Sequence, residues 1–175
     1  MTNPASVSFP EMSNLMSKMP TYSRYCSAAE AAEAERIFRH AMGFMLKECG
    51  EHLLGIAENK SQILSTEMEQ RIDDLVDRIS HIFRRLDREG TVTLIGNSAA
   101  TIAELEALDI RLILLIEEAM NLVRNLETDV PAASWFQKDA DRLTVDLACF
   151  SEMTEERNYL LGLGWESEFQ WTEGR

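Results

Sequence analysis

The chain has 175 residues, of which 45% are hydrophobic, so its size and composition are those of one globular domain. Its formal net charge is -13. A surface this acidic repels the phosphates of nucleic acids and of anionic lipids, which argues against binding to nucleic acid or to a membrane. It attracts basic partners and cations instead.

The cysteines and the N-terminal sequence predict a cytoplasmic protein. Cys26, Cys49 and Cys149 are an odd number without close spacing, which is not a disulfide framework. Cys49 and Cys149 lie in apolar helical contexts, where a cysteine behaves as a small core residue, and this fits a reducing compartment. The first 20 residues have no basic segment followed by an apolar one, so no secretory signal is predicted. The longest apolar run, 112–116, is far shorter than a membrane-spanning helix, which needs about 20 residues.

Residues 1–26 are predicted to be an N-terminal tail, because prolines and small polar residues interrupt this stretch. Within the tail, residues 10–19 begin with a proline and then place methionines and a leucine at helical spacing. This pattern fits a short docking helix, and a disordered tail is the alternative.

Four long helices follow, predicted from apolar residues at helical spacing and from capping and terminating signals. Their ranges are 28–58, 67–89, 98–128 and 134–161. The candidate N-caps, all small hydroxyl or amide residues, are Ser27, Thr66, Asn97 or Ser98, and Ser134. The β-type residues 91–95 are predicted to form an extended connection over one end of the helices.

Helices of this length, joined by connections of moderate length, favour antiparallel neighbours. The predicted fold is therefore all-α: an up-down four-helix bundle of long antiparallel helices over residues 27–163. The N-terminal tail of residues 1–26 and an aromatic, acidic C-terminal tail of residues 164–175 flank it.

Glycines within the first helix predict a close approach by another helix. Gly43 and Gly50 are seven positions apart, and Ala57 continues the series, whereas Gly55 lies on another side. Each glycine costs about 1 kcal/mol relative to alanine in a helix interior, which close packing would explain. The approaching helix could belong to the same bundle or to another subunit, and a tolerated weakness is the alternative.

No catalytic, cofactor or metal site is predicted. A di-iron bundle requires Glu-x-x-His on two helices, and none of His40, His52 and His81 follows a glutamate at that spacing. The best polar residues for a pocket inside the bundle are Glu48, His52 and Glu117. They support an alternative function, a small-molecule binder or an enzyme that uses a polar pocket in the core.

Apolar residues outside the predicted core faces carry the main functional prediction. Ile110 and Leu114 point away from the core side of the third helix. Further apolar residues lie beside the core side of the fourth helix or in the C-terminal tail. Exposed apolar patches mark interaction surfaces. We therefore expect a non-catalytic interaction protein: an adaptor, a regulator or a chaperone-like protein. It would bind a protein partner, a second copy of itself as a homodimer, or both. The alternative is that the two tails of the same chain cover these apolar residues. The predicted partner-binding residues are Ile110, Leu114, Trp135, Met153, Leu160, Trp165, Phe169 and Trp171.

Overall fold

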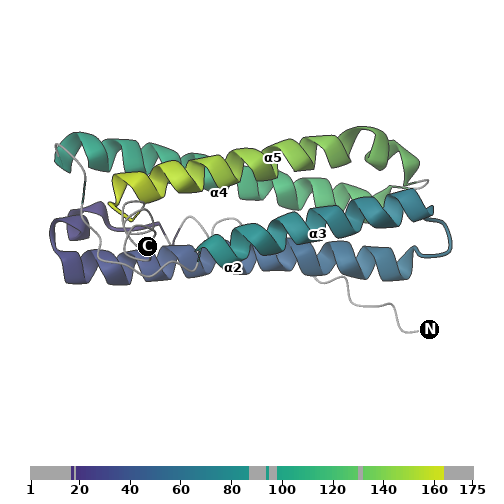
Figure 1. The fold of residues 1–175 in the computed structure, drawn as a ribbon, viewed down its shortest axis with the longest axis horizontal. Helices are drawn as coiled ribbons and strands as arrows, with labels where there is room; N and C mark the ends of the chain where they lie inside the picture. Colours follow the sequence, from purple (N-terminus) through teal and green to yellow (C-terminus); the bar gives the residue numbers. More distant parts are fainter. Residues whose placement is uncertain (1–16, 18, 87–93, 95–97, 130–131, 164–175) are drawn as a thin grey trace, which may run out of the picture.

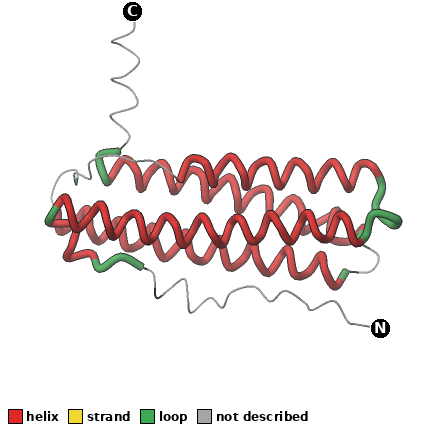
Figure 2. The backbone as a smooth tube through the Cα atoms, turned by 90° about the horizontal axis from the view of Figure 1, so that it is seen from below, coloured by secondary structure: helices red, strands yellow, loops and turns green. Residues whose placement is uncertain are grey.

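The computed structural model describes residues 17, 19–86, 94, 98–129 and 132–163, and these residues form helices and connections without a strand. The four long helices lie along the long axis of the molecule (Figures 1 and 2). They are α2 (Ala28–Asn59), α3 (Thr66–Leu86), α4 (Ser98–Thr128) and α5 (Ala133–Leu160), and a short 3-10 helix, η1 (Tyr22–Cys26), precedes α2. The predicted all-α, up-down four-helix bundle is confirmed.

The bundle consists of two antiparallel hairpins, α2 with α3 and α4 with α5 (Figure 1). The hairpins pack so that α2 contacts α4 and α3 contacts α5. The second of these contacts contains the ion pairs Arg71–Asp141 and Arg85–Glu155, which both join residues 70 positions apart. A constant offset requires the two helices to run in the same direction. Each helix of the bundle therefore has one antiparallel and one parallel neighbour.

The core follows from the spacing of apolar residues. Buried residues of α3 recur every three or four positions, which places them on one side of the helix. Each buried side chain of this size stabilises the fold by about 1.5–3 kcal/mol. The large side chains of the main core that are almost fully buried include Phe38, Met42, Leu53, Ile72, Leu75, Leu112, Ile113, Ile116, Leu143 and Phe150.

A second, smaller apolar cluster closes the end of the bundle where α2 and α4 begin and α5 ends. Tyr25 of η1 and Leu105 of α4 meet the last described residues of the chain, Leu161 and Leu163. Because these residues come from opposite ends of the chain, the cluster holds η1 and the end of α5 on the bundle. The last described residues therefore lie beside the start of α2.

Ser27 lies at the predicted N-cap position of α2 but its side chain forms no cap hydrogen bond, and the caps of α3 and α5 differ from the prediction. Before α3, Ser65 rather than Thr66 accepts a backbone hydrogen bond, from Met68 N–H at 3.3 Å. Ser134 lies inside α5, and the Oδ2 atom of Asp129 accepts the hydrogen bond of Trp135 N–H at 2.8 Å. A carboxylate upstream of the helix is a better acceptor than a hydroxyl within its first turn, so Asp129 replaces the predicted cap.

Gly43 and Gly50 face α3 within the bundle. A Cβ atom on Gly43 would lie 3.2 Å from Cε2 of Phe83, and one on Gly50 would lie 3.5 Å from Cγ2 of Ile79. A Cβ atom on Gly55 would meet nothing within 4 Å. The close approach at the first two glycines is therefore between α2 and α3 of the same chain.

Several predicted features lie outside the described residues. The predicted docking helix at 10–19 has only Ser17 and Met19 within them, and Met19 packs against the main core. Of the connection at 91–95, only Leu94 is described, and it packs against the smaller cluster. None of the described helices has the length and apolar content that a membrane span requires.

Candidate functional site

Two exposed apolar residues on α4 are where the sequence predicted them. Ile110 is 40% exposed and Leu114 is 54% exposed. They lie one helical turn apart and point opposite to the core residues Leu112 and Ile116. Since the described part of this chain leaves them in solvent, they are available to a partner.

The neighbouring helix α2 adds two more exposed apolar side chains, which the sequence analysis did not identify. Ile37 is 38% exposed and Phe44 is 49% exposed, and the seven positions between them correspond to two helical turns. Both point away from the core residues Met42 and Leu46 and so lie on the outer side of α2. They are nearer to the flank of His52, which pairs with Glu127 of α4, than to the flank of Gly43, which faces α3.

The parallel packing of α2 and α4 brings these four side chains to neighbouring levels along the bundle. Glu35 and Asp109, 74 positions apart, are bound by the same arginine, and His52 pairs with Glu127, 75 positions away. With an offset of 74 to 75, Ile37 and Phe44 lie level with positions 111–112 and 118–119 of α4. Leu114 therefore lies between their levels and Ile110 lies one or two positions before that of Ile37, so the four residues span about 13 Å along the bundle axis. We call these four residues, Ile37, Phe44, Ile110 and Leu114, the α2–α4 surface.

Three carboxylates border the α2–α4 surface. Glu106 and Glu117 lie one turn before Ile110 and about one turn after Leu114, and Glu48 lies one turn after Phe44. Glu106 is exposed, whereas Glu48 and Glu117 are half-buried. None of the three forms an ion pair with another residue of the described segments, so each is available to an outside cation.

The structure corrects the expected exposure of two fourth-helix residues. Trp135 is 1% exposed and lies in the main core, and Leu160 is also buried. Met153 is half-buried and packs against the main core. The predicted tail residues Trp165, Phe169 and Trp171 lie outside the described residues.

Trp135 is buried because α5 begins only five positions after α4 ends. The short connection folds the first turn of α5 onto the last turns of α4, where the Nε1 atom of Trp135 donates a hydrogen bond of 2.7 Å to the Leu122 carbonyl. The ring of Phe136 packs against the Trp135 ring with its edge, with the centroids 5.0 Å apart. The tryptophan therefore joins the two helices of one hairpin.

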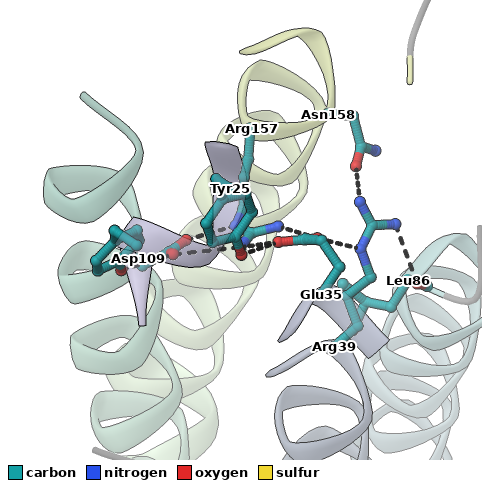
Figure 3. Close-up of polar contacts among 8 residues, drawn as sticks. Tyr25, Glu35, Arg39, Leu86, Asp109, Arg157 and Asn158 are labelled. Carbon is teal, nitrogen blue, oxygen red and sulfur yellow. Dashed lines mark hydrogen bonds and ion pairs between the residues drawn. The ribbon is translucent and has the colours of Figure 1, made fainter. Parts of the chain in front are cut away.

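A buried network of charged side chains lies at the end of the bundle that holds η1 (Figure 3). At its centre Arg157 of α5, which is 1% exposed, binds two carboxylates. Its Nε atom donates to Asp109 Oδ1 of α4 at 2.5 Å, and its Nη1 and Nη2 atoms donate to Glu35 of α2 at 2.5 and 2.6 Å. The guanidinium also lies over the Phe38 ring, 4.9 Å from the centroid.

A second arginine extends the network across the bundle. The Nε atom of Arg39 donates to Glu35 at 2.7 Å, and its Nη2 atom donates to Asn158 Oδ1 at 2.8 Å. Its Nη1 atom donates to the carbonyl of Leu86, the last residue of α3. Two arginines and two carboxylates thus balance their charges inside the bundle and connect all four helices.

Two tyrosines of η1 complete the hydrogen bonding of the carboxylates. Tyr22 donates its hydroxyl to Asp109 at 2.9 Å, and Tyr25 donates to Glu35 at 2.5 Å. Burial, the nearby carboxylates and these hydrogen bonds raise the pKa of both tyrosines far above the ordinary value. Both therefore stay protonated and hold η1 on the bundle as hydrogen-bond donors.

The two buried carboxylates have opposite pKa shifts. Burial raises the pKa of Glu35, but Arg157, Arg39 and the Tyr25 hydroxyl outweigh burial and lower the pKa to about 2. Burial is the largest effect on Asp109 and raises its pKa, since Arg157 is its one arginine partner. The surroundings therefore stabilise the charge of Glu35 more than that of Asp109.

The residues of the alternative hypothesis do not converge on a pocket in the core. The Nδ1 atom of His52 lies 2.8 Å from Oε1 of Glu127, whereas Glu48 and Glu117 border the outer surface.

Cys49 is buried, which raises the pKa of its thiol to about 12, and Cys26 is exposed. A hollow of about 370 Å³ along the start of α3 is lined by Thr66, Glu67, Gln70, Arg71 and Asp74. These residues belong to one helix and lie outside the core.

The described residues contain no group of three His, Cys, Asp or Glu side chains that could hold a metal ion. Comparisons of the chain with protein-family models, with curated proteins and with solved structures found no match. The features of the described residues that bear on function are therefore the α2–α4 surface and the buried network.

Proposed function

We propose that this chain is a non-catalytic interaction protein that binds another protein through the α2–α4 surface. The observation that carries the proposal is the exposure of four large apolar side chains on the outer sides of two adjacent helices, within about 13 Å along the bundle axis. Contiguous apolar patches on a protein surface mark interaction sites. Isolated exposed apolar residues, such as Ile63 in the connection after α2, need no such explanation.

The buried network supports this proposal because it fixes the helices that carry the surface. Ile37 lies two residues after Glu35 and Ile110 directly follows Asp109, so Arg157 holds the backbones of both at one level. A surface that is rigid before binding loses less conformational entropy when the partner binds. The network has a structural role in this proposal, since arginines and tyrosines already bind both carboxylates.

We further propose a cytoplasmic location, because the chain has three free cysteines, of which Cys49 lies in the core. The partner could in principle be a second copy of the chain, and the homodimer stays a prediction. The adaptor, regulator and chaperone-like roles all require the same surface, so the proposal does not depend on the choice between them.

The proposal is tested by the size of the protein in extracts of the cell that produces it. The wild type should elute in complexes larger than the monomer, and the double variant Ile110→Glu with Leu114→Glu should elute as a monomer. Ile63→Glu introduces a charge at an apolar residue that is 60% exposed, away from the α2–α4 surface, and should elute like the wild type. Wild-type elution as a monomer, or loss of the complexes in the Ile63→Glu variant as well, would contradict the proposal.

A further inference from the structure

We infer that the partner of the α2–α4 surface is an amphipathic helix with lysine or arginine beside its apolar side. The inference rests on the proposed function and adds the chemistry of the partner. It is carried by the position of Glu48, Glu106 and Glu117, which border the apolar residues and form no ion pair within the described segments.

The spacing along α4 matches what such a helix requires. Glu106, Ile110, Leu114 and Glu117 follow one another at intervals of three or four residues, so a carboxylate stands at each end of the apolar pair. Both glutamates lie on the flank of α4 toward α2, whereas Glu118, on the other flank, binds Arg142 of α5. The negative charge is thus beside the contact between α2 and α4, where a bound helix would lie.

Some carboxylates elsewhere on the surface are paired with a cation of the same chain. Glu33 binds Arg36 on α2, and Asp141 of α5 binds Arg71 of α3. The border of the α2–α4 surface combines exposed apolar side chains with carboxylates that form no ion pair within the described residues. An apolar strip with free carboxylates beside it complements a helix with apolar residues three or four positions apart and basic residues beside them.

A second copy of the chain fits this surface less well. Apolar contact between two copies would bring the free carboxylates of one copy close to those of the other, and like charges repel. Each copy would also add a formal charge of -13 to the complex. A basic partner removes both sources of repulsion, because its cations face Glu106 and Glu117.

The size of the surface fits a helix rather than an extended strand. Ile37 and Phe44 are about 10 Å apart along α2, the length of two helical turns. The exposed residues come from two parallel helices, and a third helix placed along their contact can present one apolar residue per turn to both. An extended strand would need backbone N–H and C=O groups that are free to hydrogen-bond with it. Within the described helices these groups bond to one another.

The experiment uses the full chain and two designed peptides of about three helical turns. Both peptides have the same leucines on one side; one has lysines beside them, and the other has glutamates. Binding is measured by fluorescence anisotropy at physiological salt. We expect the lysine peptide to bind and the glutamate peptide not to bind, with binding weakened at least tenfold by Ile110→Ser together with Leu114→Ser.

A matched pair of variants separates the local charges from the overall charge. Glu106→Gln with Glu117→Gln removes two charges at the surface, and Asp73→Asn with Asp77→Asn removes two exposed charges on α3. The first pair should weaken lysine-peptide binding by about threefold to tenfold and reduce its salt dependence, whereas the second should change it by less than twofold. Circular dichroism of each variant confirms that it is folded.

Three outcomes would overturn the inference. Equal weakening by the two pairs would mean that only overall charge attracts the peptide, and equal binding of both peptides would mean that the surface does not select basic partners. Sedimentation that shows a homodimer broken by Ile110→Ser with Leu114→Ser would make a second copy the occupant. That third result overturns the inference and leaves the proposed function intact, whereas full monomer behaviour in the cell extract contradicts the proposed function itself.

Discussion

Arg157 and Asp109 connect the end of α5 to the first half of α4 through hydrogen bonds that are shielded from solvent. Two nitrogen atoms of the guanidinium donate to the two oxygen atoms of the carboxylate, at 2.5 and 3.2 Å. The same guanidinium binds Glu35 of α2, so one side chain sets the relative level of three helices. The arrangement of the α2–α4 surface therefore depends on the stability of the network.

Replacement of Arg157 by methionine should lower the free energy of unfolding by about 3–5 kcal/mol. The variant leaves Asp109 buried without a cation and removes one of the two arginines that bind Glu35. Urea denaturation at neutral pH measures the change. Arg142→Met removes an ion pair to Glu118 from an arginine that is 58% exposed, and it should cost about 1 kcal/mol or less. Similar losses in the two variants would show that the buried network is no more important than a surface pair.

Glu35 should make the protein sensitive to acid. Its pKa is about 2 in the folded chain against an ordinary value of 4.5, so the folded chain holds the charged form more strongly. The charged carboxylate stabilises the fold at any pH above about 4.5, and this contribution disappears as the pH falls toward about 2. The difference in unfolding free energy between the wild type and Glu35→Gln should be largest at neutral pH and shrink below pH 4.5.

Asp109 provides the internal comparison for this pH series. Its pKa is raised in the folded chain, so the folded chain takes up the proton more readily than the unfolded chain. The contribution of Asp109 to the free energy of unfolding therefore increases as the pH falls from neutral through the pKa of the folded chain. The difference between the wild type and Asp109→Asn should therefore change with pH in the opposite direction. Parallel pH profiles for the two variants would contradict the assigned shifts.

Alanine substitutions at three α2 glycines should raise the free energy of unfolding by amounts that follow the space around each glycine. Gly55→Ala has open space and should raise the free energy of unfolding by about 1 kcal/mol through helix propensity alone. Gly50→Ala meets Ile79 at ordinary contact distance and should gain a similar amount. Gly43→Ala should gain less, because the Phe83 ring must move by a few tenths of an ångström. Thermal denaturation compares the three, and a largest gain at Gly43 would contradict the close approach of α3.

Replacement of Asp129 by alanine should destabilise the start of α5 by about 1 kcal/mol. The carboxylate accepts hydrogen bonds from the Trp135 backbone at 2.8 Å and from the Ser134 hydroxyl at 2.5 Å. Ser134→Ala leaves the first of these bonds in place and should have a smaller effect. If Ser134→Ala were the more harmful change in urea denaturation, Ser134 rather than Asp129 would be the cap.

Much of the fold follows from local patterns in the sequence. The predicted range 98–128 coincides with α4, and the predicted ranges of α2 and α5 differ from the structure by one residue at their ends. Each of these helices has apolar residues at helical spacing, with polar caps, glycine or proline near its ends, and these signals act over a few residues. They do not specify which helices are neighbours, so the parallel contacts of α2 with α4 and of α3 with α5 came only from the structure.

The buried network was missed, although a signal for it exists in the sequence. Glu35, Asp109 and Arg157 each occupy a core position of their helix: Asp109 lies four residues after Leu105, and Arg157 lies seven after Phe150. A charged residue in such a position suggests a partner of opposite charge. The identity of that partner depends on how distant helices pack, which helical spacing alone does not determine.

The dependence on how helices pack also explains why some predicted partner-binding residues are exposed and others are buried. Ile110 and Leu114 lie opposite the core side of α4, where no neighbouring helix can cover them, so their exposure follows from helix geometry alone. Trp135 lies beside the core side of α5, where cover depends on the adjacent helix, and α4 buries it. Helical spacing therefore predicts exposure with confidence only for residues directly opposite a core face.

The most direct test of the α2–α4 surface as the binding site is photo-crosslinking in the living cell that produces the protein. A photoreactive phenylalanine analogue replaces Leu114 in one variant and, as the control, the more exposed Ile63 in another. The account predicts a discrete covalent adduct with one protein partner from position 114 and none from position 63. Adducts of equal yield from both positions, or an adduct from position 63 alone, would contradict it.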